Sequence, residues 1–405
     1  MTEIITIPES WKMQNILENS TLKARIGWQG LTTTEYKKTG KIYLVTGTDF
    51  KDGKIDWENC VYVDEKRYSQ DKNIQIKIDD VLVTKDGTIG KIAYVDKLPL
   101  PTTLNSGIFV IRSIKNDYLH LFLFYILSSN YFIKFLNKLK AGSTIIHLYQ
   151  KDFASFNFVV PPISEQQQII QILSNTDKLI EKLEKIIEKK KNIKQGAIQE
   201  FLTGTKRLDG FNEKWIFTKL DEVAEMFSGG TPLTSNRSYY DGNIPWVIIT
   251  DITKAKKYLY STEKNITQQG LESCSAKIFQ KGVLLFAMYA SIGKCCIAKI
   301  DVTCNQAILG IVTKKIDTEF LYQHMVFSEK RFSQMGQTGT QNNLNKEMVQ
   351  NLDIPYPHID EQIAIGKILS DMDVEINELE KNRDKYVMIK NGMMQKLLTG
   401  EIRLK

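Results

Sequence analysis

One stretch of this chain occurs twice. Residues 161–208 return as residues 357–404, displaced by 196 positions without a gap, and 23 of the 48 aligned residues are identical. The chain therefore reads as domain, repeat, domain, repeat. A unit that occurs twice in one chain can build an internal two-fold axis, as two identical chains do in a homodimer. Such a pseudo-dimer suits a target that is itself bipartite.

Each copy of the repeat has the residue spacing of a long helix with a heptad seam. In the first copy, Ser164 and Gln167 follow two prolines and predict a capping-box start; Asp360 takes the place of the cap in the second copy. Apolar or tolerated residues then recur four and three positions apart: Ile169, Leu173, Thr176, Ile180, Leu183 and Ile187, and again Ile365, Leu369, Met372, Ile376 and Leu379. This spacing predicts two helices that pair as a coiled coil.

Glycines recur at matching places in both copies. Gly204 and Gly400 end a Leu-Thr-Gly sequence, where a left-handed residue closes a helix. Gly196 and Gly392 lie inside the predicted helices. A glycine in a helix interior costs about 1 kcal/mol against alanine. We therefore expect a close helix approach or a kink at these two positions.

The repeat also predicts how the two helices run. A helix of about 39 residues is roughly 58 Å long. In a parallel pair, residues 209–356 would have to connect the end of one helix to the start of the other, but a compact domain of that size is only about 38 Å across. We therefore expect antiparallel helices with one globular domain at each end. The simpler alternative is a structural coiled coil with no measuring role.

The blocks 1–160 and 209–356 look like diverged copies of one α+β domain. The segments that correspond are a tight turn (86–91 and 289–294), an asparagine (Asn105 and Asn305), an amphipathic helix (117–139 and 317–335), and a polar loop (142–144 and 339–343) that precedes Leu148 or Leu344. The side chains in these segments differ. Two domains that read two different half-sites would have this pattern.

The composition excludes several classes of protein. A net charge of +7 and a pI of about 8.8 are compatible with a polyanionic partner but do not require one. Five cysteines without a C-x-x-C pair indicate free thiols in a reducing compartment, and the four scattered histidines make a metal site unexpected. The longest apolar run, 119–127, is too short to span a bilayer, and no signal peptide opens the chain. We expect a cytoplasmic protein.

Catalytic motifs are missing. The chain has no G-x-S-x-G, no glycine-rich dinucleotide motif and no Asn/Asp-Pro-Pro-aromatic box of amino-methylating enzymes. The two glycine-lysine turns lack phosphate-loop spacing, because Ile92 and Cys295 stand where a hydroxyl residue is required. The turn lysines fit a DNA-backbone contact or an ordinary solvent-exposed turn equally well. An endonuclease carboxylate cluster stays open, although no acidic residues have a suitable spacing.

These features together resemble the DNA-specificity subunit of type I restriction-modification systems. The residues that carry the resemblance are Gly229-Gly230-Thr231-Pro232, Ile244-Pro245-Trp246 followed by Asp251-Ile252, and the Pro-x-x-x-Glu-Gln starts and Leu-Thr-Gly ends of the repeats. In the first domain, residues 26–30 and 42–45 replace the Gly-Gly-Thr-Pro and Ile-Pro-Trp elements. The match therefore covers nearly the whole chain and is weakest in the first domain.

The resemblance implies a division into four parts with separate roles. Residues 1–160 and 209–356 would be target-recognition domains, each reading one half of an asymmetric, bipartite DNA sequence. Residues 161–208 and 357–405 would be helical regions that set the spacing and dock two modification subunits. Those subunits would carry S-adenosylmethionine and methylate adenine after base flipping, and separate translocase subunits with ATP and magnesium would cut. This chain would itself have no cofactor and no catalytic residue.

Polar side chains of the two domains are the candidate DNA contacts, because residues of these types bind phosphate oxygens and base edges. In the first domain they are Arg25, Trp28, Gln29, Lys85, Thr88, Lys91, Ser143, Thr144 and His147, and in the second Thr231, Asn236, Arg237, Tyr289, Ser291, Lys294, Thr340, Gln341, Asn342 and Asn343. Two other functions stay open: part of a self-sufficient DNA methyltransferase or endonuclease, and a coiled-coil scaffold without a DNA role.

Overall fold

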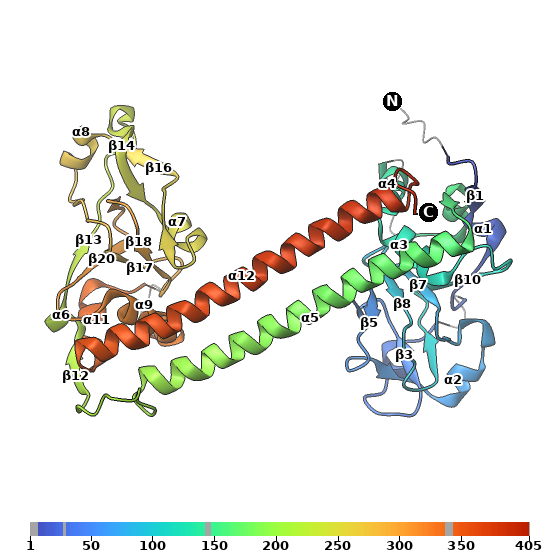
Figure 1. Cartoon of the computed structure of the whole chain (residues 1–405), viewed down its shortest axis with the longest axis horizontal. Helices are drawn as coiled ribbons and strands as arrows, with labels where there is room; N and C mark the ends of the chain where they lie inside the picture. Colours follow the sequence, from blue (N-terminus) through green and yellow to red (C-terminus); the bar gives the residue numbers. More distant parts are fainter. Residues whose placement is uncertain (1–6, 27–29, 142–146, 337–342, 405) are drawn as a thin grey trace. The chain divides into compact units, whose positions relative to one another are not determined.

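The structure of the chain, a computed structural model, describes residues 7–26, 30–141, 147–336 and 343–404 (Figure 1). It divides into two units: Met1–Leu183 with Asn382–Lys405, and Glu184–Lys381. Each unit therefore combines one globular domain with a segment from each copy of the repeat.

The first unit is built on a four-stranded antiparallel sheet with the order β2-β10-β7-β8. Its strands are β2 (Ser20–Lys23), β10 (Ile108–Ser113), β7 (Val81–Thr84) and β8 (Ile92–Tyr94). A smaller sheet has the order β6-β3-β9, in which β3 pairs with β9 in parallel. The remaining strands are β3 (Tyr43–Val45), β6 (Val61–Tyr62), β9 (Thr102–Leu104), the pair β4 (Phe50–Lys51) and β5 (Lys54–Ile55), and the pair β1 (Lys12–Asn15) and β11 (Asn157–Val160).

The second unit repeats this topology. Its main sheet has the order β13-β20-β17-β18-β15, and its smaller sheet the order β16-β14-β19, with β14 and β19 parallel. The strands are β13 (Ala224–Ser228), β20 (Ile308–Thr313), β17 (Leu284–Ala287), β18 (Cys295–Ala298), β15 (Tyr258–Leu259), β16 (Lys264–Ile266), β14 (Tyr240–Val247), β19 (Thr303–Cys304), and the pair β12 (Ile216–Lys219) and β21 (Asp353–Tyr356). The prediction of two diverged copies of one mixed α/β domain is confirmed, and β15 is an added edge strand.

The amphipathic segment of each domain forms two helices rather than the single helix predicted from its pattern. In the first unit, α3 ends and α4 begins around Ser129, whose hydroxyl donates to the carbonyl of Ile126 at 2.6 Å. The backbone of Ser129 is extended, so the helix cannot continue through it. The short helices are α1 (Ile16–Asn19), α2 (Glu65–Ser69), α3 (His120–Ser128), α4 (Asn130–Ala141), α6 (Leu220–Val223), α7 (Ile249–Lys254), α8 (Gln268–Glu272), α9 (Thr318–Phe327), α10 (Glu329–Gly336) and α11 (Lys346–Gln350).

The repeat forms two long helices, α5 (Ile163–Leu202) and α12 (Ile359–Leu397). They begin one residue before Ser164 and Asp360, so the predicted capping role of these two residues is wrong; both lie in the first turn. Gly204 and Gly400 have φ of 70° and 78°, which confirms the left-handed ends. None of the described helices is long and apolar enough to cross a membrane.

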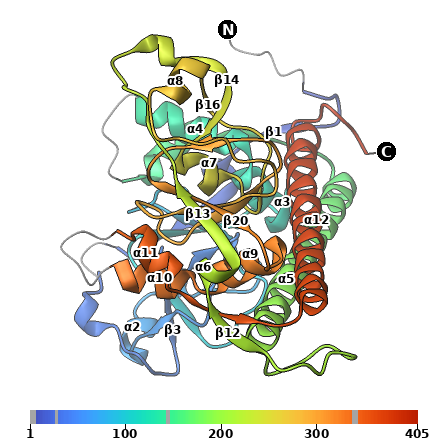
Figure 2. The ribbon, with the colours of Figure 1, turned by 90° about the vertical axis from the view of Figure 1, so that its left-hand side faces the viewer.

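Within each unit, the two segments of α5 and α12 run antiparallel and lie side by side (Figures 1 and 2). In the first unit, Lys390 binds Asp177 at 2.5 Å, and in the second, Lys194 binds Asp373 at 2.5 Å. These two ion pairs correspond residue for residue through the displacement of 196. The predicted antiparallel packing of the two helices and the internal repeat are therefore confirmed.

The interior glycines of the helices do not mark a close approach. A Cβ atom added at Gly196 or Gly392 would meet nothing within 4 Å, and both residues are exposed. The expectation of tight packing there is wrong. The seam is most deeply buried near the globular domains, at Ile169 and Leu173 in the first unit and at Ile365 and Leu369 in the second. There it continues into the domain cores.

Candidate nucleic-acid interface

A tight turn joins the two adjacent strands β7 and β8, and an equivalent turn joins β17 and β18. In the first unit, the amide of Gly90 donates to the carbonyl of Thr84 at 2.9 Å. In the second, the amide of Gly293 donates to the carbonyl of Ala287 at 3.1 Å. The glycines need their positive φ of 84° and 86°, which other residues rarely adopt. The turns that were aligned by sequence therefore share one backbone structure.

The loops around the first turn converge on the same end of the sheet. The amide of Lys85 donates to the carbonyl of Gly107 at 2.8 Å, and the carbonyl of Lys85 accepts from the amide of Leu148 at 2.8 Å. The side chain of Asn105 shapes its own loop by accepting from the amide of Gly107 at 3.0 Å. Three segments that lie far apart in the sequence therefore form one surface.

The second unit repeats each of these contacts. The amide of Met288 donates to the carbonyl of Ala307 at 2.9 Å, and the carbonyl of Met288 accepts from the amide of Leu344 at 3.0 Å. Asn305 accepts from the amide of Ala307 at 3.1 Å. The paired asparagines in the sequence are thus structural residues that hold the loop beside the turn.

In the first unit, the structure brings Lys85, Thr88, Lys91 and His147 together around the turn. Thr88 is exposed, and the ammonium of Lys85 lies 5.5 Å from the ring centre of Phe109. The Nδ1 atom of His147 lies 2.5 Å from a carboxylate oxygen of Asp86, with half of the His147 side chain exposed. This surface offers donors and acceptors of the kinds that bind DNA.

Arg25 does not belong to this surface. It is 2% exposed, and its Nε donates to the carbonyl of Leu104 at 2.9 Å while an Nη donates to the hydroxyl of Thr103 at 3.0 Å. Burial lowers the pKa of the guanidinium. The prediction that Arg25 contacts DNA is wrong, because its donors are used inside the first unit.

In the second unit, Thr231, Tyr289 and Ser291 lie on the surface formed by the turn and its neighbouring loops. The hydroxyl of Thr231 donates to the side chain of Gln306, the residue after Asn305. Tyr289 is 37% exposed and occupies the start of the turn. Gln306 is exposed and was missed by sequence reasoning, although its neighbour Asn305 had been singled out.

The other described candidates of the second unit have different neighbours. Lys294 forms an ion pair with Glu329 at 2.9 Å. Asn236 caps a 3-10 turn, Arg237–Tyr239, by accepting from the amide of Ser238 at 3.2 Å, and Arg237 is exposed on that turn. Asn343 begins the segment that leads through Leu344. The candidates that lie outside the described residues are Trp28, Gln29, Ser143, Thr144, Thr340, Gln341 and Asn342.

A buried glutamate joins the two copies of the repeat in the first unit. Glu165, at the start of α5, accepts two hydrogen bonds from Arg403, which follows α12, at 2.7 and 2.8 Å. The indole of Trp11 donates to the same carboxylate at 3.2 Å, and the guanidinium lies 5.6 Å from the Trp11 ring centre. Although burial opposes its ionisation, these donors lower the pKa of Glu165. We call Trp11, Glu165 and Arg403 the first junction.

The second unit contains the same arrangement. Glu361, at the start of α12, accepts from Arg207 at 2.6 and 2.7 Å and from the indole of Trp215 at 3.0 Å. We call Trp215, Glu361 and Arg207 the second junction. The neighbouring glutamines, Gln166 and Gln362, each accept from a backbone amide just before the domain helix, at 2.8 and 2.9 Å. The Glu-Gln pair of each repeat start is thus structural.

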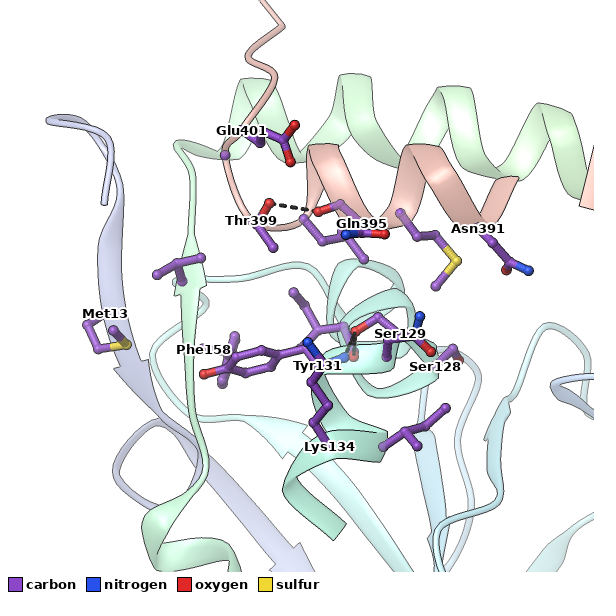
Figure 3. A pocket seen from close by; sticks show the side chains of 17 residues that line it. Met13, Ser128, Ser129, Tyr131, Lys134, Phe158, Asn391, Gln395, Thr399 and Glu401 are labelled. Atoms are coloured by element: carbon purple, nitrogen blue, oxygen red, sulfur yellow. Dashed lines mark hydrogen bonds between the residues drawn. The ribbon is translucent and has the colours of Figure 1, made fainter. Parts of the chain in front are cut away.

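One cavity of about 780 Å³ lies in the first unit, away from the candidate contacts (Figure 3). Its wall comes from β1, α3, α4, β11 and the last turns of α12, including Met13, Tyr131, Lys134 and Gln395. None of the predicted DNA contacts lines it. Among the residues that the structure describes, no three histidine, cysteine, aspartate or glutamate side chains gather as metal ligands.

Comparison with known proteins gives one consistent result. Residues 29–195 and 212–387 each match the type I restriction modification DNA specificity domain. The type I restriction enzyme MjaVIII specificity subunit of Methanocaldococcus jannaschii is 25% identical over 430 residues, which cover 99% of each protein.

Two solved structures have the same fold. The S subunit of a type I restriction-modification system from M. genitalium has a TM-score of 0.62 at 16% identity, over 96% of each chain. A chain solved in work on complex assembly and conformational transition of the type I R-M system has a TM-score of 0.57 at 18% identity, over 98% of this chain and 99% of that one. With both halves matched by the same family model, this chain belongs to the type I restriction-modification DNA-specificity family, as a subunit with two specificity domains.

Proposed function

We propose that each globular domain reads one half of a bipartite, asymmetric DNA sequence. The observation that carries this proposal is the pair of equivalent turns. The backbone hydrogen bonds of Gly90 and Gly293 that close the two turns correspond, yet the first turn displays Asp86-Gly87-Thr88 and the second Tyr289-Ala290-Ser291. Side chains of different hydrogen-bonding character select different base edges. A shared scaffold with different displayed residues therefore supports two readers of two half-sites.

We further propose that α5 and α12 set the distance between the half-sites and dock two modification subunits. The internal repeat supports this part, because two equivalent helical segments offer two equivalent surfaces to two copies of one partner. In this proposal the partners carry S-adenosylmethionine, and translocase subunits carry ATP and magnesium. The complex would act in the cytoplasm, and this chain would supply the address without a catalytic residue or cofactor of its own.

Domain exchange tests the two-reader proposal. Residues 209–356 are replaced by the matching block of a relative, and the methylated sequence is read in a host that carries the modification subunits. One half of the methylated sequence should change while the other half stays the same. A change in both halves would contradict independent reading.

Helix length tests the spacing proposal. Insertion of one heptad into α5 keeps the seam in register and lengthens the helix by roughly 10 Å. DNA rises about 3.4 Å per base pair, so the gap between half-sites should grow by up to about three base pairs. A smaller insertion beside Gly204, where the helix ends, should shift the gap with less damage to packing. An unchanged gap in an active complex would mean that the helices hold the protein together without setting the spacing.

A further inference from the structure

Two lysines of the second unit approach one aromatic ring from separate segments. The ammonium of Lys277 lies 4.2 Å from the ring centre of Phe227, and that of Lys346 lies 5.9 Å from it. Lys277 is exposed and Lys346 is half-buried. A ring face attracts cations, but the attraction is only about 0.5–1 kcal/mol at exposed sites. We call these three residues the Phe227 cluster.

The positive charge of this cluster is not neutralised by the described part of the chain. Some lysines of this unit have an acidic partner, as Lys194 and Lys294 do. No ion pair joins Lys277 or Lys346 to a described acidic residue. Two like charges held near one ring repel each other, and an anion between them would relieve the repulsion.

The cluster adjoins the candidate interface on two sides. Phe227 lies in β13, just before the Gly229–Thr231 segment, and a Cβ atom added at Gly230 would lie 2.6 Å from the amide nitrogen of Ala276, next to Lys277. Lys346 follows Leu344, whose amide is hydrogen-bonded to the turn residue Met288. DNA that lies on the turn would therefore have its backbone within reach of both lysines.

The corresponding position of the first unit is also basic. Phe227 pairs with Gly310 across the sheet, and the preceding residue, Met226, pairs with Ile311. In the first unit, Lys23 and Leu22 hold the same places, opposite Val110 and Ile111. Lys23 is exposed. The first unit thus carries a lysine at the strand position that Phe227 holds in the second unit, where the two lysines lie beside the Phe227 ring.

We propose that the Phe227 cluster is a DNA-phosphate clamp that positions the second domain on its half-site without reading bases. This inference rests on the proposed function. Phosphate contacts fix the register of a protein on DNA but carry no sequence information, and each contact adds about 0.9 to the salt dependence of binding. Lys277 and Lys346 are therefore predicted to act equally on every sequence.

The test compares two double variants in the complete complex with its modification subunits. K277Q/K346Q removes the clamp. K281Q/K299Q is the matched control, because both of its lysines are exposed at the end of the β17–β18 hairpin that lies opposite its turn. Lys299 also lies 4.2 Å from an aromatic ring centre, that of Tyr258. Affinity for duplexes with the methylated sequence, and with one mismatched base pair, is measured between 50 and 200 mM salt.

The slope of log affinity against log salt should fall in magnitude by up to about 1.8 in K277Q/K346Q and stay unchanged in the control. The affinity ratio of wild type to variant should change about tenfold across this salt range. Discrimination against the mismatch should be preserved, and K277R/K346R should restore the slope. Thermal melting checks that each variant is folded.

Two results would overturn the clamp. One is a slope equal to that of the control, and the other is lost discrimination at an unchanged slope, which would make the lysines base readers. A wild-type complex without sequence preference would instead contradict the proposed function, and the clamp with it. The wild-type measurement therefore separates the two failures.

Discussion

The junctions and the turns are both duplicated, but they have diverged in opposite ways. In the junctions, the tryptophan, glutamate and arginine are the same in both units, with matching hydrogen bonds. In the turns, the backbone is the same and the displayed side chains differ. A junction is held together by hydrogen bonds between its three side chains, so replacing one of them removes those bonds. A turn keeps its shape through its backbone, so its exposed side chains are free to differ. The side chains that the turns display can therefore change while the backbone that carries them stays fixed.

The largest expected effect is at the junctions. Glu361→Ala would leave Arg207 and the Trp215 indole without their acceptor, and Glu165→Ala would do the same in the other unit. Each glutamate accepts three side-chain hydrogen bonds, two of them from the arginine, and a hydrogen bond to a charged group contributes about 1.5–3 kcal/mol. Denaturant unfolding of the full chain should show a similar loss for both variants. Glu200→Ala, at an exposed helix position, is the control and should leave the stability nearly unchanged. Losses of stability in the two junction variants that differ by more than about 2 kcal/mol would mean that the junctions are not equivalent.

The paired aspartates of the helices should have the next largest effect. Asp177 binds Lys390 and the Tyr125 hydroxyl, whereas Asp373 binds Lys194 and the side-chain amide of Gln323. Hydrogen bonds to charged groups contribute about 1.5–3 kcal/mol. Double-mutant cycles for Asp177–Lys390 and Asp373–Lys194 should give couplings of the same sign in both units. A coupling near zero in one unit alone would break the symmetry of the helix pairing.

Acid should weaken the second unit more than the first. Gln323 and Tyr125 occupy equivalent positions, because each binds the paired aspartate of its own unit. The next residue, His324, therefore corresponds to the buried Ile126. Burial, with the nearby charge of Arg331, lowers the pKa of His324 to about 4. Since the unfolded histidine titrates near pH 6.5, the unfolded state binds more protons between these values, and stability falls as the pH drops through this window.

Comparison of His324→Gln with the wild type isolates this contribution. Between pH 7.5 and pH 5 the wild type should lose about 1–2 kcal/mol more than the variant. Hydrogen exchange of α9 should report the loss, while α3 responds equally in both proteins. An equal acid response of α9 in the two proteins would show that His324 is not the titrating group.

The smallest expected effect concerns the left-handed residue of each turn. Gly87 has φ of 68°, and its counterpart Ala290 has φ of 58°. A residue with a Cβ atom costs about 1 kcal/mol there. A Cβ atom at Gly87 would meet nothing within 4 Å, so Gly87→Ala should destabilise through the backbone alone, and Ala290→Gly should stabilise by a similar amount. Thermal melting measures both effects. If the melting temperatures of Gly87→Ala and Ala290→Gly shifted in the same direction, the two positions would not be equivalent.

Much of the architecture could be predicted from the sequence because local patterns specify it. The heptad spacing predicts α5 and α12, and the Leu-Thr-Gly ends predict Gly204 and Gly400 as left-handed residues. The repeat predicts antiparallel pairing by a chain-length argument. The same kind of pattern failed at Ser129, because a single apolar stripe fits one long helix as well as two short helices with a break between them.

The candidate interface was less predictable because it depends on contacts between distant segments. Sequence comparison identified the turns and the asparagines, and the structure places them together. The sequence alone could not distinguish Arg25, which is buried, from Thr88, which is exposed. The identity of a polar residue is the same in either place, and only the folded chain determines which atoms meet water.

The sequence by itself determined the duplicated plan of this protein, its helices and the family to which it belongs. These features follow from residue spacing, which acts over a few neighbouring residues, and from the repetition of one segment, which is visible when its two copies are aligned. Only the tertiary structure decided that Glu165 and Glu361 close the junctions and that Lys277 and Lys346 share Phe227. Those groups come from segments up to 238 residues apart. Their meeting depends on how whole strands and helices pack, which no local pattern specifies.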